Sequence, residues 1–242
     1  MTSISGRYIK ITPCCGTSYS LSRYSSMNFM SSAVWTDGYR EQSLMPNDRG
    51  LRVCQCGNYF LLNELVEVGQ LESTDVPATM RVLPDDLNNA IRVARIEEIK
   101  LIARLDYWQE LNHSYRERYK EHREKEEASF LAQQRGETMW GRVKKLMLNK
   151  TSKHEIKRQI TFPQFSPSDE QRTNVVEILK LLANRNFEGY EMVAVELYRE
   201  NGDFEKAIER LRQVDAAYDP TLSMLMQRLC DERESAVVRY RY

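Results

Sequence analysis

The sequence predicts an α+β fold that is mainly α-helical. Short runs rich in β-branched and aromatic residues flank four clustered cysteines near the N-terminus, and such runs are typical of strands. From Leu87 onward, apolar residues recur every three to four positions, which is the period of a helix that buries one face. Further amphipathic segments follow a proline-containing break. We therefore expect a small four-cysteine β module at 1–80, a long charged helical region at 84–160 and a helical domain at 168–242.

The bulk composition is that of a folded protein with no overall electrostatic preference. The 242 residues are 41% hydrophobic, which is enough to bury a sizeable core. The 35 basic and 35 acidic side chains balance, but residues 81–160 carry 18 basic and 13 acidic ones, a net charge of +5. No apolar run reaches the ~18 residues of a membrane-spanning helix, and the polar N-terminus lacks the apolar stretch of a secretory signal. We expect a soluble, cytoplasmic protein without a membrane partner.

Four of the five cysteines form two tight pairs that predict a metal site. Cys14 and Cys15 are adjacent, Cys54 and Cys56 are separated by one residue, and each pair is followed by a glycine. In a reducing compartment, clustered thiols favour metal binding over disulfide formation. Four thiolates complete the tetrahedral coordination of Zn2+ and leave no open position for chemistry. We predict that these four cysteines bind one structural Zn2+, with a redox or catalytic pair, or incidental thiols, as alternatives. Cys230 is expected to be a small buried apolar residue.

Each cysteine pair with its glycine resembles a knuckle of a zinc ribbon. The usual knuckle is Cys-x-x-Cys-Gly, in which the glycine permits the turn that directs backbone amides at the sulfurs. Here the first pair has no spacer and the second has one residue. Strands are expected at 6–12, 51–53 and 59–62, and residues 17–50 would be a large insertion. This insertion is rich in aromatic residues and methionine, which fits either a binding loop or the small core that a metal-held module needs.

A long helical segment is predicted to begin at Pro84. Proline and the acidic residues Asp85 and Asp86 favour the first turn of a helix. No glycine or proline follows before Gly136, so we expect one long helix or two. Residues 162–167 then break the helical pattern and form the predicted linker.

The segment 139–158 is strongly basic. Apolar residues interleave with its lysines and arginines, so one face of the segment could contact phosphates or an acidic partner. The alternative is an ordinary surface on which lysine stems cover a neighbouring helix. The candidate contact residues are Arg142, Lys144, Lys145, Lys153 and Lys157.

The C-terminal region predicts packed helices at 170–186, 188–200 and 221–234. Residues from about 188 to 220 resemble one tetratricopeptide repeat (TPR). The matching features are an aromatic late in the first helix, a glycine turn, an aromatic that opens the second helix and a small residue at the helix crossing: Tyr198, Gly202, Asp203, Phe204 and Ala207. A lone repeat cannot bury its apolar face, so the resemblance implies a TPR-like bundle with neighbouring helices and a surface for protein interaction.

The sequence supports no enzymatic activity. It contains no phosphate-binding glycine loop, no Gly-x-Ser-x-Gly nucleophile motif and no histidine-rich metal motif on a helix. We therefore expect a non-enzymatic adaptor or subunit of a multiprotein assembly, with a protein partner and with homo-oligomerisation left open. One alternative is a nucleic-acid-associated zinc protein that uses the segment 139–158. A further alternative is a thiol-dependent enzyme.

Overall fold

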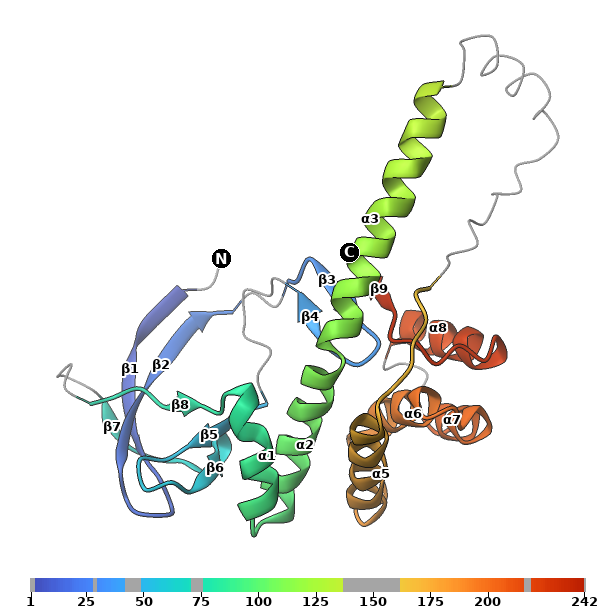
Figure 1. Ribbon diagram of the computed structural model, residues 1–242. Coiled ribbons are helices and arrows are strands. Elements are labelled where there is room, and N and C mark those ends of the chain that lie inside the picture. The colour runs from blue at the N-terminus through green and yellow to red at the C-terminus, as the bar shows by residue number, and fades with distance from the viewer. Residues whose placement is uncertain are drawn as a thin grey trace. The chain divides into compact units, whose positions relative to one another are not determined.

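The computed structural model describes residues 3–27, 30–41, 49–70, 76–136, 162–215 and 219–241. Contacts divide the chain into two compact units, of which the first comprises residues 1–111 with 167–242 and the second residues 112–166. The predicted α+β class is confirmed, because antiparallel sheets formed largely by the N-terminal part precede the helices (Figure 1). About half of the chain is helical. The basic segment 139–158 lies outside the described residues.

The strands of the described residues form three small antiparallel sheets. In chain order they are β1 (Ser3–Ile11), β2 (Ser18–Ser26), β3 (Ala33–Trp35), β4 (Arg40–Glu41), β5 (Leu51–Val53), β6 (Tyr59–Leu61), β7 (Val66–Gln70), β8 (Met80–Arg81) and β9 (Arg239–Arg241). The sheet orders are β2-β1-β7, β6-β5-β8 and β4-β3-β9. The third sheet joins the C-terminal strand to residues 33–41, because Val34 of β3 pairs with Arg241 of β9. A short 3-10 helix, η1 (Leu62–Glu64), follows β6.

The three predicted strands are confirmed, and the described residues of the insertion between the cysteine pairs include further strands. Residues 17–50 contribute β2, β3 and β4. Tyr19 and Trp35 are fully buried, whereas Met27 and Met30 are largely exposed. The aromatic residues of the insertion therefore divide between core and surface.

Two of the described helices begin at a residue whose side chain caps the first turn. In chain order the helices are α1 (Pro84–Val93), α2 (Glu97–Leu111), α3 (His113–Gly136), α5 (Asp169–Ala183), α6 (Glu191–Glu200), α7 (Phe204–Leu211) and α8 (Pro220–Asp231). Ser168 caps α5, because its hydroxyl accepts a hydrogen bond from the amide of Gln171 while the Gln171 side chain returns one to Ser168. Asp219 caps α8 in a similar way by accepting from the amide of Leu222.

The helix predicted from Pro84 onward is three helices rather than one or two. The backbone of Ala94 is extended, with ψ of 123°, and this ends α1 without a glycine or proline. Helices α1 and α2 then pack against each other, which lets Leu87 and Ala90 join Ile99 in the core. Burial of apolar residues on both sides of the break stabilises a turn that local sequence signals do not show.

Two apolar clusters lie between the helices of the first unit. The larger one joins β5 and β6 to α1, α2, α5 and α6, with Trp108 of α2 and Ile178 of α5 fully buried. The smaller one joins α6, α7 and α8 around Ala207, Met226 and Cys230. Cys230 is 2% exposed, and its burial raises the pKa of the thiol to about 11, so the prediction of a buried apolar cysteine is confirmed.

The described part of the second unit comprises residues 112–136, which include α3, and residues 162–166, which pack against α3. The rings of Tyr115 and Phe165 meet edge to face with their centroids 4.9 Å apart, and Tyr119 stacks on Phe162 at 6.2 Å. The Tyr115 hydroxyl donates to the carbonyl of Pro163 at 3.3 Å. The predicted linker at 162–167 is therefore packed along most of its length.

Candidate metal centre

Two tight turns position the four cysteine side chains. The first turn follows β1, where the amide of Gly16 donates to the carbonyl of Thr12 at 3.0 Å. The second follows β5, where the amides of Cys54 and Gly57 donate to the carbonyls of Asn58 and Cys54, both at 2.8 Å. Gly16 and Gly57 have φ of 70° and 84°, a left-handed conformation that costs least for glycine. Each cysteine pair therefore lies in a glycine turn, as the sequence predicts.

The four sulfur atoms converge on one point. All lie within 4.8 Å of one another. The separations are 3.8 Å between Cys14 and Cys15, 3.6 Å between Cys14 and Cys56, and 3.4 Å between Cys15 and Cys54. Sulfurs placed tetrahedrally about 2.3 Å from a Zn2+ ion would be about 3.8 Å apart. The cluster can therefore hold a metal ion, and its geometry fits zinc.

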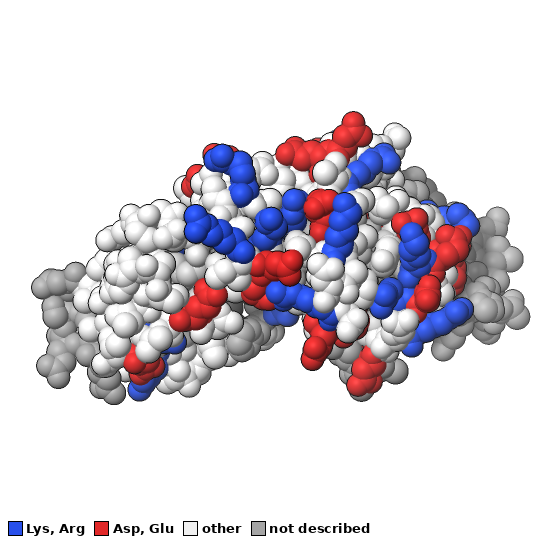
Figure 2. All heavy atoms as spheres, turned by 90° about the horizontal axis from the view of Figure 1, so that it is seen from below, with Lys and Arg blue, Asp and Glu red and all other residues white. Residues whose placement is uncertain are grey.

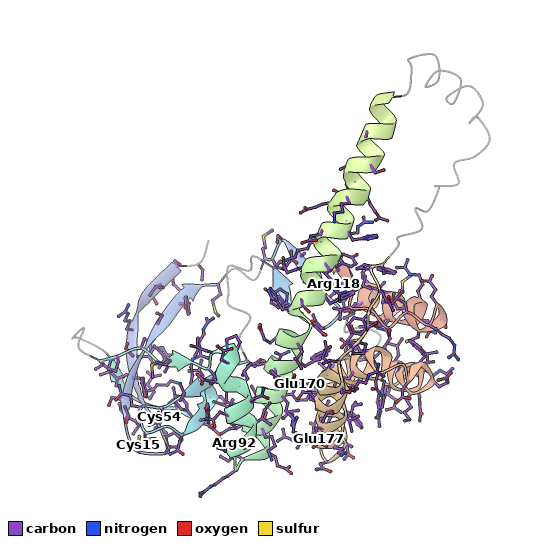
Figure 3. All side chains as sticks on the ribbon, in the orientation of Figure 1. Cys15, Cys54, Arg92, Arg118, Glu170 and Glu177 are labelled. Carbon is purple, nitrogen blue, oxygen red and sulfur yellow. The ribbon has the colours of Figure 1, made fainter. Side chains whose placement is uncertain are left out.

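The sulfur separations do not fit a disulfide. A disulfide requires two sulfurs about 2.05 Å apart, and the shortest separation in the cluster is 3.4 Å. All five cysteines are free thiols. Figure 3 shows Cys15 and Cys54 close together at the ends of the N-terminal strands.

Polar groups around the sulfurs form a second layer of contacts. Thr17 lies 2.9 Å from the Cys15 sulfur, and the side-chain amide of Asn58 donates to the Cys56 sulfur at 3.3 Å. The buried hydroxyl of Tyr19 donates to the Cys54 sulfur at 3.6 Å. Such partners orient metal ligands and stabilise their thiolate form.

The environments of the thiols differ within the cluster. The hydrogen bond from Thr17 lowers the pKa of Cys15 to about 5. Burial opposes ionisation of Cys54, but hydrogen bonds from the Cys56 amide and the Tyr19 hydroxyl outweigh it and lower the pKa of Cys54. Removal of water around the sulfur raises the pKa of Cys14 to about 12, although the residue as a whole is exposed. A bound cation would hold all four groups as thiolates.

Neither the three histidines nor the basic residues of the segment 139–158 belong to the described cysteine cluster. His113 and His122 belong to α3 in the second unit, and His154 lies outside the described residues. Arg142, Lys144, Lys145, Lys153 and Lys157 also lie outside them. Within the described ranges, the four cysteines are the one group of three or more metal-ligating side chains that converges in this way.

A second polar cluster, which the sequence did not reveal, is fully buried among the helices. Arg199 and Glu196 of α6 are both 0% exposed and form a bidentate ion pair with distances of 2.8 and 2.6 Å. Arg199 also donates to the carbonyl of Glu234 at 2.5 Å, and Trp108 of α2 donates to Glu200 at 2.8 Å. Burial raises the pKa of Glu200 well above its usual range. These bonds connect α6 to α2 and to the C-terminal segment, so the cluster has a structural role.

No family model, curated protein or solved structure matches this chain. Among the described helices, none is both long and apolar enough to cross a lipid bilayer.

Proposed function

We propose that the chain is a non-enzymatic adaptor or subunit of a multiprotein assembly whose N-terminal module is held together by a structural Zn2+. The observation that carries this proposal is the convergence of four sulfurs at tetrahedral spacing. Four thiolate ligands fill the coordination sphere of zinc, so no position is open for water or substrate. A site of this kind contributes folding energy rather than catalysis.

The positions of the four cysteines support a role in joining two sheets. Cys14 and Cys15 follow β1 of one sheet, whereas Cys54 and Cys56 follow β5 of another. The apolar cluster between these sheets is small and consists of Tyr19, Cys54, Phe60 and Leu65 with two partly buried leucines. A zinc ion bound by both turns would join the two sheets where apolar burial is limited.

The helical part supplies the proposed partner surface. Helices α6, α7 and α8 pack around Ala207, and Gly202 with φ of 82° forms the turn between α6 and α7. The TPR-like pattern of the sequence is part of this proposal, because repeats of this type commonly present helices to other proteins. The visible face in Figure 2 carries interleaved acidic and basic side chains over the helices, whereas the part over the N-terminal strands is mostly uncharged. Because fold alone does not fix function, the partner role needs its own test.

The zinc part of the proposal is tested by elemental analysis of purified, tag-free protein. We expect one Zn2+ per chain, which Cys54→Ser should abolish or reduce strongly. Cys230→Ala is the matched control, because Cys230 lies in the helical core outside the cluster and its loss should leave the zinc content unchanged. Chelation should expose residues 1–70 to proteolysis while most of the helical circular dichroism persists. Zinc-free protein with a protease-resistant N-terminal part would refute the structural role. It would favour the alternative in which two of the cysteines form a redox pair.

The adaptor part is tested in extracts of the native host. The native protein should elute from a sizing column with a mass well above that of the 28.5 kDa chain, and cross-links to its partner should map to α5–α8. Elution of all of the protein as a monomer in such extracts would contradict the adaptor role. It would leave the zinc result unaffected.

A further inference from the structure

The four cysteines of the candidate metal centre differ in their access to solvent. Cys14, Cys15 and Cys56 are exposed, whereas Cys54 is 2% exposed and lies in the apolar cluster with Tyr19. The thiolate is the reactive form of cysteine, and oxidation selects thiolates at accessible positions. Because a bound metal ion keeps its ligands as thiolates, the three exposed ligands would combine both conditions for oxidation.

The distances between the sulfurs favour one of the possible disulfides. The Cys14 and Cys56 sulfurs are 3.6 Å apart and those of Cys15 and Cys54 are 3.4 Å apart, so either pair would form a bond after an approach of about 1.5 Å. Cys14 and Cys15 are a poor pair, because consecutive Cα atoms are about 3.8 Å apart and disulfides usually span about 4.4–6.8 Å. Of the two pairs that connect the turns at these distances, Cys14 with Cys56 is the one in which both residues are exposed.

We propose that oxidation regulates the zinc site: a hydroperoxide converts Cys14 and Cys56 into a disulfide, and Zn2+ is released. This inference rests on the structural zinc proposed above and adds its regulation. One thiolate attacks an oxygen of hydrogen peroxide, the O–O bond breaks, and a sulfenic acid and hydroxide form. The second thiolate attacks the sulfenic sulfur and displaces hydroxide. Two thiolates, one hydrogen peroxide and two protons thus yield one disulfide and two water molecules.

The disulfide would replace the metal ion as the link between the two turns. Cys15 and Cys54 remain as thiolates, and two sulfurs do not complete the coordination of zinc. The new bond connects the turn after β1 to the turn after β5, which are the turns that the ion would join. The oxidised module therefore stays cross-linked without zinc. A thiol reductant reverses the reaction by exchange, in which two reductant thiols become a disulfide.

The experiment treats the full-length, zinc-loaded chain with hydrogen peroxide and follows zinc release with a chromophoric indicator. All proteins carry Cys230→Ala, which leaves the cluster as the source of thiols. Cys56→His and Cys15→His each replace one exposed ligand by a residue that can bind zinc but cannot form a disulfide. Cys15→His retains the pair of Cys14 and Cys56, whereas Cys56→His does not. We therefore expect peroxide to release zinc at least about tenfold faster from Cys15→His than from Cys56→His.

The chain with all four ligands gives an independent measurement. Fragmentation mass spectrometry of its non-reduced peptides should place the disulfide between Cys14 and Cys56, with one Zn2+ released for each disulfide formed. Dithiothreitol with added Zn2+ should restore the zinc content. Residues 1–70 of the oxidised protein should resist proteolysis at least about fivefold longer than those of the reduced, chelated protein, because the disulfide keeps the turns together.

Elemental analysis before oxidation separates this inference from the proposed function. Absence of zinc from the purified chain would refute the structural site and the redox inference with it. Zinc that is present before oxidation and retained after it would overturn the redox inference alone. Equal release from the two histidine variants would also overturn it, as would a disulfide between other cysteines, or sulfinic acids in place of a disulfide.

Discussion

The hydroxyl of Tyr19 donates a hydrogen bond to the sulfur of Cys54 at 3.6 Å and accepts one from the amide of Gln55 at 2.9 Å. One buried side chain on β2 thereby fixes the turn that holds the second cysteine pair. Its ring also stacks on Phe60 with a centroid distance of 6.1 Å. Tyr19 therefore connects the apolar packing of the N-terminal module to the geometry of the candidate metal ligands.

Removal of the Tyr19 hydroxyl should weaken metal binding and leave the apolar packing of the ring intact. Tyr19→Phe preserves the ring but deprives the Cys54 sulfur of a donor and the Gln55 amide of an acceptor. Loss of such a partner typically lowers metal affinity by about 10- to 100-fold. Competition with a chromophoric zinc chelator measures this change. Tyr24→Phe, at an exposed position on the same strand, should have no effect, and equal affinities for all three proteins would show that Tyr19 does not support the ligands.

The cysteine cluster could be predicted from the sequence because its signal is local. Two cysteine pairs, each followed by glycine, predict two turns, and both glycines adopt left-handed conformations. The irregular spacing within the pairs did not prevent convergence of the sulfurs. The contribution of Tyr19 was not predicted, because nothing in the sequence shows that a tyrosine from β2 reaches a turn 35 residues away.

Other contacts between residues far apart in the sequence were not predictable either, because local sequence does not show which distant residues meet. The pairing of Val34 with Arg241 depends on tertiary register, for which short strands carry little sequence information. The break after Val93 lacks glycine and proline and follows from packing. The TPR-like identity of the C-terminal helices and the domain boundaries stay predictions.

Enlargement of Ala207 should destabilise the C-terminal helices. Ala207 is 0% exposed and packs with Met192 and Val195 of α6 and Met226 of α8. Ala207→Leu would place a larger side chain at a fully buried position, and such overpacking costs about 1–3 kcal/mol in the free energy of unfolding. Urea denaturation monitored by circular dichroism measures this cost. Glu209→Leu places the same leucine side chain at an exposed position of α7 and should change stability little, so equal effects of the two substitutions would argue against a tight crossing at Ala207.

A substitution at Gly57 should test the conformation of the second cysteine turn. The φ of 84° is unfavourable for residues with a Cβ atom, although no atom lies within 4 Å of the Cβ that alanine would add. Gly57→Ala should therefore cost about 1–2 kcal/mol through backbone strain alone. Thermal melting of the zinc-loaded protein monitors the change. Gly69→Ala is the control, because Gly69 does not have a left-handed φ and its Cβ position is also open. If Gly57→Ala melted like the control, the left-handed turn would be refuted.

The buried carboxyl of Glu200 should make stability fall as pH rises. Burial, followed by the nearby charge of Glu196, raises the pKa of Glu200 well above its ordinary value of 4.5. Between the unfolded and folded pKa values, the folded state keeps a proton that the unfolded state has lost, so a rise in pH through this window lowers the free energy of unfolding. Glu200→Gln removes this penalty and can still accept the hydrogen bond from Trp108.

The melting temperature of Glu200→Gln relative to the unaltered chain should therefore increase from about pH 5 to about pH 8. Glu177→Gln provides a control of opposite sign (Figure 3). The hydrogen bond from Lys180 lowers the pKa of Glu177, so its carboxylate stabilises the fold above the unfolded pKa and loses this contribution as pH falls. At about pH 8 we expect Glu177→Gln to melt slightly below the unaltered chain and Glu200→Gln above it. A difference for Glu200→Gln that stays constant between the two pH values would show that Glu200 ionises alike in the folded and unfolded states.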